Sequence, residues 1–196
     1  MVPPIQIQPP TLNVPNDITV EATSSSGSVV TFSITASDAE DNPDPTPVCN
    51  HASGSLFPIA TTTVICSVTN SWGVVMSDSF TVRVRDTAGP VLSLPANITA
   101  EATGSNGRAV TFTATAIDLV DGPRTVTCFP GTGSTFSIGT TTVNCWSFDS
   151  RVNFSTGSFT ITVRDTTPPT LKSPSQHHCG SYRSFWQSCH VYSHSD

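Results

Sequence analysis

The stretch DITVEATSSSGSVVTFSITASDAED, at residues 17–41, returns at residues 97–121 as NITAEATGSNGRAVTFTATAIDLVD. Apolar and small polar residues alternate at 30–36 in the first copy and at 110–116 in the second. A period of two residues is typical of a β-strand with one buried face. The sequence therefore predicts that the chain builds the same β-structure twice.

The similarity extends outward from this stretch in both directions. A proline-containing phrase precedes each copy, as PPTLNVP at 9–15 and GPVLSLP at 89–95, and it returns as PPTLKSP at 168–174. Each unit of about 80 residues is long enough to bury its own core, unlike the short units of a solenoid. The expected segments are an N-terminal extended segment at 1–9, a β-sandwich at 10–88, a second β-sandwich at 89–167, and a proline linker with a Cys/His-rich tail at 168–196.

Alternation continues through the second half of each unit. It runs through Val64, Cys66 and Val68, and again through the stretches at 80–84 and 159–163. Turn-forming sequences such as SSSG, GSNG and DNPDP separate the runs. Short amphipathic strands at this spacing favour a two-sheet antiparallel sandwich, and no segment has a convincing helical period.

The composition excludes two classes of function. The net charge is −6, and Lys172 is the one lysine among 196 residues, so there is no basic patch for nucleic acid or anionic lipid. No apolar run approaches the roughly 20 residues that a membrane helix needs. The start MVPPIQIQPP has neither the basic region nor the apolar core of a signal peptide. We expect no nucleic-acid partner and no membrane insertion.

The cysteines indicate the compartment. Cys49 and Cys66 are 17 residues apart, as are Cys128 and Cys145. A pair repeated at fixed spacing, without CxxC or flanking histidines, predicts one disulfide per module. Closing such a loop would stabilise each module by about 3 kcal/mol in the chain-entropy model. Because disulfides persist outside the cytosol, we expect an extracellular, secreted or cell-surface protein.

At this point the residues resemble a known family. VPNDITVEAT, an acidic turn, a cysteine, SGSLFPIATTTVIC and a closing FTVRVRDT resemble the hyalin repeat (HYR), and the second unit carries CFPGTGSTFSIGTTTVNC. The resemblance covers roughly residues 10–170. It implies an all-β fold of two tandem immunoglobulin-like antiparallel β-sandwiches joined by a short Pro-containing linker, and a role in adhesion or scaffolding without catalysis. The family often has an Asp and a Gly-Asn turn after the second cysteine, where TNSWGVV and SFDSRVN stand here.

A set of carboxylates is matched between the repeats. Hard oxygen ligands on loops near a seam could bind calcium and stiffen the joint, whereas the alternative is solvated turn carboxylates that accept backbone hydrogen bonds. Asp86 closes the first module just before a seam, so we expect it to meet acidic groups on either side. No other cofactor is expected. The candidate calcium ligands are Glu21, Asp38, Asp41, Asp86, Glu101, Asp118, Asp121 and Asp165.

Catalysis finds little support. His51 is the only histidine before residue 177, and Pro130 stands at its place in the second unit. A serine hydrolase needs a positioned base, and no GxSxG elbow is present. Carboxylate pairs could indicate a glycosidase, but the same set in both small sandwiches favours structural turns.

The tail SQHHCGSYRSFWQSCHVYSHSD, from residue 175, differs in kind from the repeats. Cys179 and Cys189 are expected to form a disulfide, with zinc binding as the alternative. The segment is otherwise either not native to the protein or a truncated third module. The zinc alternative would use His177, His178, Cys179, Cys189, His190 and His194.

Two further features bear on partners. Asn97 and Asn153 begin N-glycosylation sequons. Ile5 and Ile7 alternate with glutamines outside either repeat, and this segment could act as a donor strand that pairs with the open sheet edge of a neighbouring chain. The alternative is a leader that is disordered or folds back on the first module.

These features together predict a non-enzymatic extracellular structural or adhesive protein. It would be a rod of HYR-like modules, with other protein modules or copies of itself as partners, and strand addition could assemble it head-to-tail into filaments. The alternative is a carbohydrate-binding accessory module of a secreted enzyme, with extracellular glycans as ligands. Trp72 and Trp146 would then be the aromatic contacts.

Overall fold

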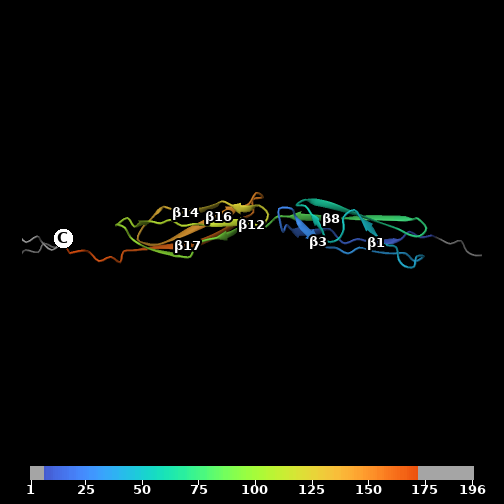
Figure 1. Cartoon of the computed structure of the whole chain (residues 1–196), viewed down its shortest axis with the longest axis horizontal. Helices are drawn as coiled ribbons and strands as arrows, with labels where there is room; N and C mark the ends of the chain where they lie inside the picture. The colour runs from blue at the N-terminus through green and yellow to red at the C-terminus, as the bar shows by residue number, and fades with distance from the viewer. Residues whose placement is uncertain (1–6, 172–196) are drawn as a thin grey trace, which may run out of the picture. The chain divides into compact units, whose positions relative to one another are not determined.

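The computed structural model of the chain describes residues 7–171 and consists, over that range, of β-strands and the turns between them (Figure 1). Among the described residues, 7–165 form one compact unit, and 166–171 belong to a second. The second unit has no strand in its described residues, 166–171. The domain boundaries expected at residues 10, 89 and 168 remain predictions.

The first sandwich has one four-stranded sheet, in the order β2-β8-β7-β5, and two two-stranded pairs, β1-β4 and β3-β6. β2 lies parallel to β8, whereas the other pairs are antiparallel. The strands are β1 (Thr11–Asn13), β2 (Ile18–Glu21), β3 (Ser28–Val30), β4 (Thr35–Ser37), β5 (Val48–Cys49), β6 (Ser55–Phe57), β7 (Thr61–Thr69) and β8 (Val75–Arg85).

The second sandwich repeats this plan. Its four-stranded sheet has the order β10-β17-β16-β14, with β10 parallel to β17, and it faces the sheet β13-β12-β9 and the pair β11-β15. The strands are β9 (Val91–Ser93), β10 (Ile98–Glu101), β11 (Arg108–Ala109), β12 (Thr115–Asp118), β13 (Gly122–Arg124), β14 (Val126–Phe129), β15 (Thr135–Phe136), β16 (Gly139–Phe148) and β17 (Phe154–Arg164).

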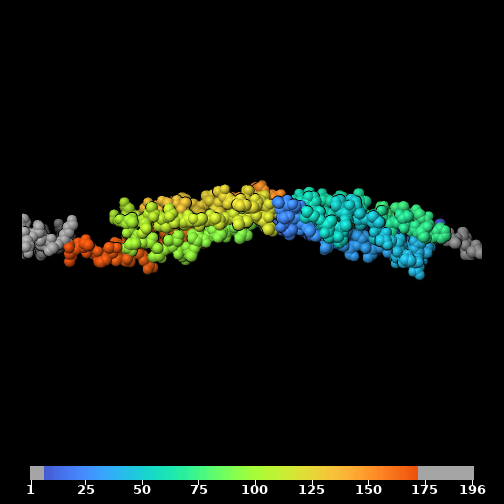
Figure 2. Space-filling view, viewed as in Figure 1, coloured from blue at the N-terminus to red at the C-terminus, as the bar shows by residue number. Residues whose placement is uncertain are grey.

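Each sandwich has a core of its own. Val64, Cys66 and Val68 are buried along β7, as their alternation predicts, while the residues between them face outward. An edge-to-face aromatic pair recurs in both cores: the Phe32 and Phe80 ring centroids are 5.0 Å apart, and those of Phe112 and Phe159 are also 5.0 Å apart. The colours of the two sandwiches do not mix in Figure 2, because each is built from one continuous stretch of chain.

The stretch at 30–36 keeps its predicted alternation but is not one continuous strand. β3 ends at Val30 and β4 begins at Thr35. Between them, the Ser53 hydroxyl accepts a hydrogen bond from Phe32 N (2.8 Å) and donates one to Phe32 O (2.6 Å). Thr132 does the same for Phe112, at 2.8 Å each. A side-chain hydroxyl thus satisfies a backbone that has no strand partner at this point.

Both disulfides expected within the modules are present. Cys49 bonds to Cys66 across β5 and β7, and Cys128 bonds to Cys145 across β14 and β16. In each case the two cysteines are direct cross-strand partners. Cys179, Cys189 and the histidines near them lie outside the described residues.

Candidate metal centre at the interdomain seam

The linker between β8 and β9 is fastened to the first sandwich by Glu21. This carboxylate, at the end of β2, accepts hydrogen bonds from Thr87 N (2.7 Å), the Thr87 hydroxyl (2.6 Å) and Ala88 N (3.1 Å). The bond from the Thr87 hydroxyl lowers the pKa of Glu21 below its usual 4.5, and the two backbone amides lower it further against the opposing effect of burial. The ionised carboxylate therefore fixes the first half of the linker.

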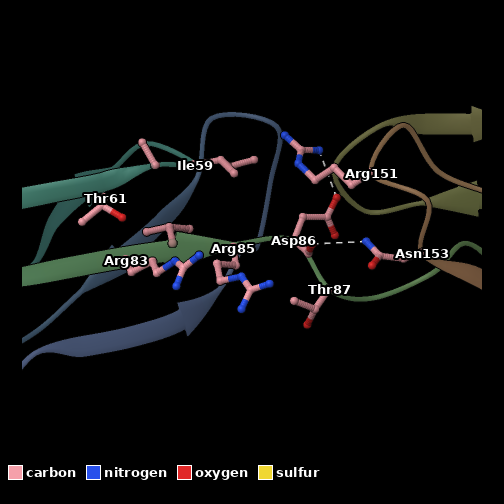
Figure 3. Close-up of a pocket in the computed structure, with 10 residues that line it drawn as sticks. Ile59, Thr61, Arg83, Arg85, Asp86, Thr87, Arg151 and Asn153 are labelled. Atoms are coloured by element: carbon pink, nitrogen blue, oxygen red, sulfur yellow. Dashed lines mark hydrogen bonds and ion pairs between the residues drawn. The ribbon is translucent and has the colours of Figure 1, made fainter.

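The second sandwich holds the same linker from its β16–β17 loop. Arg151 Nη1 donates to Asp86 Oδ2 at 3.1 Å, and Asn153 Nδ2 donates to the Asp86 carbonyl at 3.2 Å (Figure 3). Val152 lies between these two residues with a φ of 69°. This left-handed conformation is uncommon for a β-branched residue, and here it separates two side chains that both reach Asp86.

Apolar contacts add to the joint. Val120, in the turn after β12, is 8% exposed and belongs to the same buried cluster as the core of the first sandwich. Glu40 stands at its place in the first repeat. Gly89 lies so close to the Phe154 backbone that a Cβ atom would come within 2.6 Å of the carbonyl carbon. The two sandwiches are thus joined by packing of Val120 and by the close approach of Gly89 as well as by hydrogen bonds.

Three buried carboxylates meet at this seam. Asp86, Asp118 and Asp149 each offer an oxygen, and these oxygens lie within 4.8 Å of one another. Burial raises the pKa of Asp86 above its usual 3.8, and the charges of Asp118 and Asp149 raise it further, while Arg151 opposes them. A hollow of about 370 Å³ opens beside Asp86, lined in part by Arg151 and Asn153.

The chemistry of this donor set fits a calcium ion. Calcium takes oxygen ligands, mostly from carboxylates, carbonyls and water. Arg151 is shared between Asp86 and, at 3.6 Å, Asp121, so it neutralises only part of the negative charge. Asp86, Asp118 and Asp149 are the residues that would hold the ion, and bound calcium would supply the missing positive charge.

The corresponding place in the first sandwich is built differently. Asn70 stands where the second repeat has Asp149, and its Nδ2 donates to Asp38 Oδ2 at 3.0 Å and to the Gln8 carbonyl at 3.2 Å. The bond from Asn70 lowers the pKa of Asp38. In the first sandwich the Asn70 amide therefore stabilises the Asp38 carboxylate by donating a hydrogen bond. In the second sandwich the corresponding residue, Asp149, is a second carboxylate beside Asp118.

The structure brings together only two of the eight predicted calcium ligands, Asp86 and Asp118. Asp41 instead accepts hydrogen bonds from the Ser71 amide and hydroxyl, and Asp121 accepts one from Ser150 N at 2.6 Å. The Ser150 bonds lower the pKa of Asp121. Glu21 binds the linker and Asp38 binds Asn70. Glu101 ends β10, and Asp165 is exposed after β17.

Asp149 is the candidate ligand that the sequence pattern did not single out. It lies in SFDSRVN, the segment after the second cysteine, and its Oδ1 accepts hydrogen bonds from Arg151 N (2.8 Å) and Asn153 N (2.7 Å). Its counterpart in the first repeat is Asn70, so Asp149 is not among the acidic residues that the two repeats share. The acidic residue that the family often carries after this cysteine was the available signal.

The remaining candidate residues lie apart from the seam carboxylates. Trp72 is 53% exposed in the β7–β8 loop, and Trp146 is half-buried in β16. His51 stacks on Phe57, and its buried Nδ1 has no hydrogen-bond partner among the described residues. Ile7 is 47% exposed, whereas Ile5 lies outside the described residues.

The fold is that of a protein built from disulfide-bonded β-sandwiches, and sequence comparison identifies the family. Residues 85–163 match the family model of the HYR domain. The chain is 31% identical over 176 residues to Hyalin from Strongylocentrotus purpuratus, an alignment that covers 85% of this chain and 15% of that protein. The protein therefore contains an HYR domain at residues 85–163. It spans about 15% of the length of this curated relative.

Solved structures also match this chain, each with a low TM-score. Domains 3–5 of Drosophila OTK match with a TM-score of 0.38 and 15% identity over 79% of this chain and 62% of that one. Immunoglobulin domains 1–5 of Sidekick-1 match with a TM-score of 0.39 and 12% identity over 81% and 40%. Human Protocadherin-24 EC1-2 matches with a TM-score of 0.34 and 15% identity over 83% and 100%.

The HYR domain, the Hyalin relative and the two disulfides place the protein outside the cell or at its surface. The described residues include no helix with the length and apolarity needed to cross a bilayer.

Proposed function

We propose that the chain is a non-enzymatic structural or adhesive element of the extracellular space, a rod of HYR-like modules whose joint is stiffened at the seam. The observation that carries this proposal is the fastening of one short linker from both sides. Glu21 binds Thr87 and Ala88 from the first sandwich, while Arg151 and Asn153 bind Asp86 from the second. A spacer needs such a joint, because a free linker would transmit neither distance nor orientation.

Calcium is the ligand that we propose for this joint. The seam draws Asp86 from the linker and Asp118 and Asp149 from the second sandwich into one buried cluster. Repulsion among the three carboxylates opposes closure of the seam, and a divalent cation would remove that repulsion. The joint would therefore stiffen at millimolar extracellular calcium and loosen when the ion is removed.

Calorimetric titration and thermal unfolding in millimolar calcium or EDTA test this proposal. We expect calcium to raise the Tm of the wild-type chain and to have no effect on Asp149→Asn, which restores the residue found in the first sandwich. Asp78→Asn, an exposed carboxylate in β8, is the matched control and should respond like the wild type. An unchanged Tm and unchanged solution dimensions between calcium and EDTA would rule out the ion.

Assembly into filaments is a further part of the proposal. It is supported by the alternation of Ile5 and Ile7 and by the exposure of Ile7, next to a fold whose sheets have open edges. A donor strand from a neighbouring copy would give a head-to-tail contact, which propagates as a ring or a filament. Other modules or copies of this chain are the expected partners.

Deletion of residues 1–9, with Ile5→Asp/Ile7→Asp as a milder change, tests strand donation. If the intact chain polymerises, as followed by light scattering and electron microscopy, both variants should remain monomeric. Equal polymerisation by all three proteins would contradict the donor-strand mechanism and leave the stiff-joint proposal untouched.

One observation favours carbohydrate binding as a second candidate function. Trp72 is 53% exposed on a loop, and an exposed indole can stack on a sugar ring. Binding on a glycan array that disappears with Trp72→Ala would support this function. Arrays that bind wild type and variant alike, or neither, would contradict it.

A further inference from the structure

The two N-glycosylation sequons have different surroundings in the structure. Asn97 is exposed immediately before β10, whereas Asn153 is half-buried at the seam, immediately before β17. We propose that Asn97 is an N-glycosylation site and that Asn153 is not, because the Asn153 amide is committed to the seam. This inference does not depend on calcium binding.

The amide nitrogen of Asn97 is free for modification. Its Oδ1 accepts a hydrogen bond from Thr160 N at 2.9 Å. Asp17, at the same place in the first repeat, accepts one from Thr81 N at 2.7 Å through its own Oδ1. An aspartate has no amide group, so the acceptor oxygen alone performs the structural role. The Nδ2 of Asn97 has no hydrogen-bond partner among the described residues, and a substituent there disturbs no contact.

The other residue of this sequon is equally accessible. Thr99 is exposed in β10. Because successive side chains of a strand point to opposite faces, Asn97 and Thr99 lie on the same side, while Ile98 between them turns toward the core. The amide and the hydroxyl that define the sequon are therefore exposed together.

Asn153 offers no such freedom. Its Nδ2 donates to Asp149 Oδ2 at 2.6 Å and to the Asp86 carbonyl at 3.2 Å. These two bonds use both amide protons. A glycan on this nitrogen would replace one proton with carbon, break one of the bonds and place a bulky polar group in a packed joint. A chain glycosylated at Asn153 could not close the seam as the structure has it.

The modification itself is a transfer from a lipid-diphosphate-linked oligosaccharide. A bond forms between Asn97 Nδ2 and the anomeric carbon of the first sugar, the bond between that carbon and the diphosphate oxygen breaks, and the lipid diphosphate leaves as the amide gives up one proton. No protein contact has to be broken for this exchange.

A glycan at Asn97 also distinguishes the two sandwiches as pairing surfaces. β10 is an edge strand of its sheet, and Asn97 stands at its start. A bulky glycan there would cover the edge and block an incoming strand, and exposed edges left uncovered invite such pairing. β2 is the corresponding edge of the first sandwich, and it begins after Asp17, which cannot be glycosylated. Strand addition at this edge is therefore confined to the first sandwich.

Secretion of the full chain from a eukaryotic host that transfers N-glycans tests the proposal. Glycopeptides are mapped after enzymatic glycan release in ¹⁸O-labelled water, which marks each formerly occupied asparagine. Asn97→Asp reproduces the residue of the first sandwich, Thr99→Ala removes only the sequon hydroxyl, and Asn153→Asp removes the other sequon. We expect one glycan on the wild type, none on Asn97→Asp or Thr99→Ala, and one on Asn153→Asp.

Thermal unfolding separates a lost site from a misfolded variant. Asn97→Asp should melt with unglycosylated wild type that is produced in a host without N-glycan transfer, because the Oδ1 contact to Thr160 is kept. An occupied Asn153 in the folded, secreted fraction would overturn the proposal, and so would an unoccupied Asn97.

Discussion

At the scale of single residues, the two modules differ where one of them faces the seam. Asn70 and Asp149 occupy the same place in the two repeats, as do Trp72 and Arg151. In the first sandwich the Asn70 amide donates a hydrogen bond to Asp38. In the second sandwich Asp149 adds a negative charge beside Asp118, and the positive charge of Arg151 neutralises part of the negative charge of this cluster. A few substitutions thus allow the β16–β17 loop of the second sandwich to contact the linker that follows the first sandwich.

Val152 is the residue whose backbone makes this possible. Its φ of 69° is a conformation that Gly73, its counterpart, adopts without strain at 80°. A β-branched residue in this region costs about 1–3 kcal/mol. We expect Val152→Asn, which tolerates the left-handed region, to raise the free energy of unfolding by about 1 kcal/mol in urea titrations. Gly73→Val is the reciprocal control and should lower it; equal stabilities would contradict the assignment of strain.

The hydrogen bonds from Thr87 and Ala88 to Glu21 predict that stability depends on pH. Because the pKa of Glu21 is lowered in the folded state, its contribution to stability is present above about pH 4.5 and is lost as the pH falls through the folded pKa. Glu21→Gln should therefore lower the Tm at about pH 6.5, and the difference should close as the pH falls through the folded pKa of Glu21. The raised pKa of Asp86 acts with the opposite sign, and because the Glu21 charge contributes to it, Glu21→Gln also reduces this opposing effect. A Tm difference independent of pH would contradict this role of Glu21.

At the scale of elements, each sandwich is built from its own strands and contains one disulfide. The bridges link β5 to β7 and β14 to β16, so each joins an edge strand to the centre of the four-stranded sheet. Cys66 and Cys145 are buried, while their partners lie toward the sheet edge. The edge strand β5 has only two residues, and the covalent bond therefore holds an element that few backbone hydrogen bonds secure.

Removing one bridge should affect its own sandwich alone. We expect Cys128→Ala/Cys145→Ala to lower the free energy of unfolding of the second sandwich by about 3 kcal/mol. Hydrogen exchange followed by mass spectrometry would report this loss in β14, β16 and β17, with β7 and β8 unchanged. The Cys49→Ala/Cys66→Ala variant should give the mirror result. Equal loss of protection in both sandwiches would show that they unfold as one cooperative unit.

At the scale of the whole molecule, the seam is the feature that makes two sandwiches one compact unit. Val120 packs into the buried cluster of the first sandwich, Glu21 holds the linker on that side, and Asn153 holds it on the other. Polar bonds alone would exchange readily with water at such a joint, whereas buried apolar area has no comparable partner in solvent.

Val120→Glu, which restores the residue of the first repeat, should loosen the joint without unfolding either sandwich. Electron–electron distance measurements between a spin label in each sandwich should give a broader distribution than in the wild type. Leu119→Glu is the matched control, because its side chain is 69% exposed and should leave the distribution unchanged. An unaltered distribution in Val120→Glu would mean that Val120 does not hold the seam.

The sequence by itself determined the features that both modules share. The alternation at 30–36, the paired cysteines and the proline-containing seams are local or repeated signals, and they predict two disulfide-bonded sandwiches. The tertiary structure alone decided how Asp149 meets Asp86 and why Asn153 differs from Asn97. The reason is physical. The seam occurs once, between the end of the first repeat and the loops of the second. It therefore depends on residues that differ between the repeats and lie far apart in the chain. Neither periodicity nor internal alignment contains that information until the chain has folded.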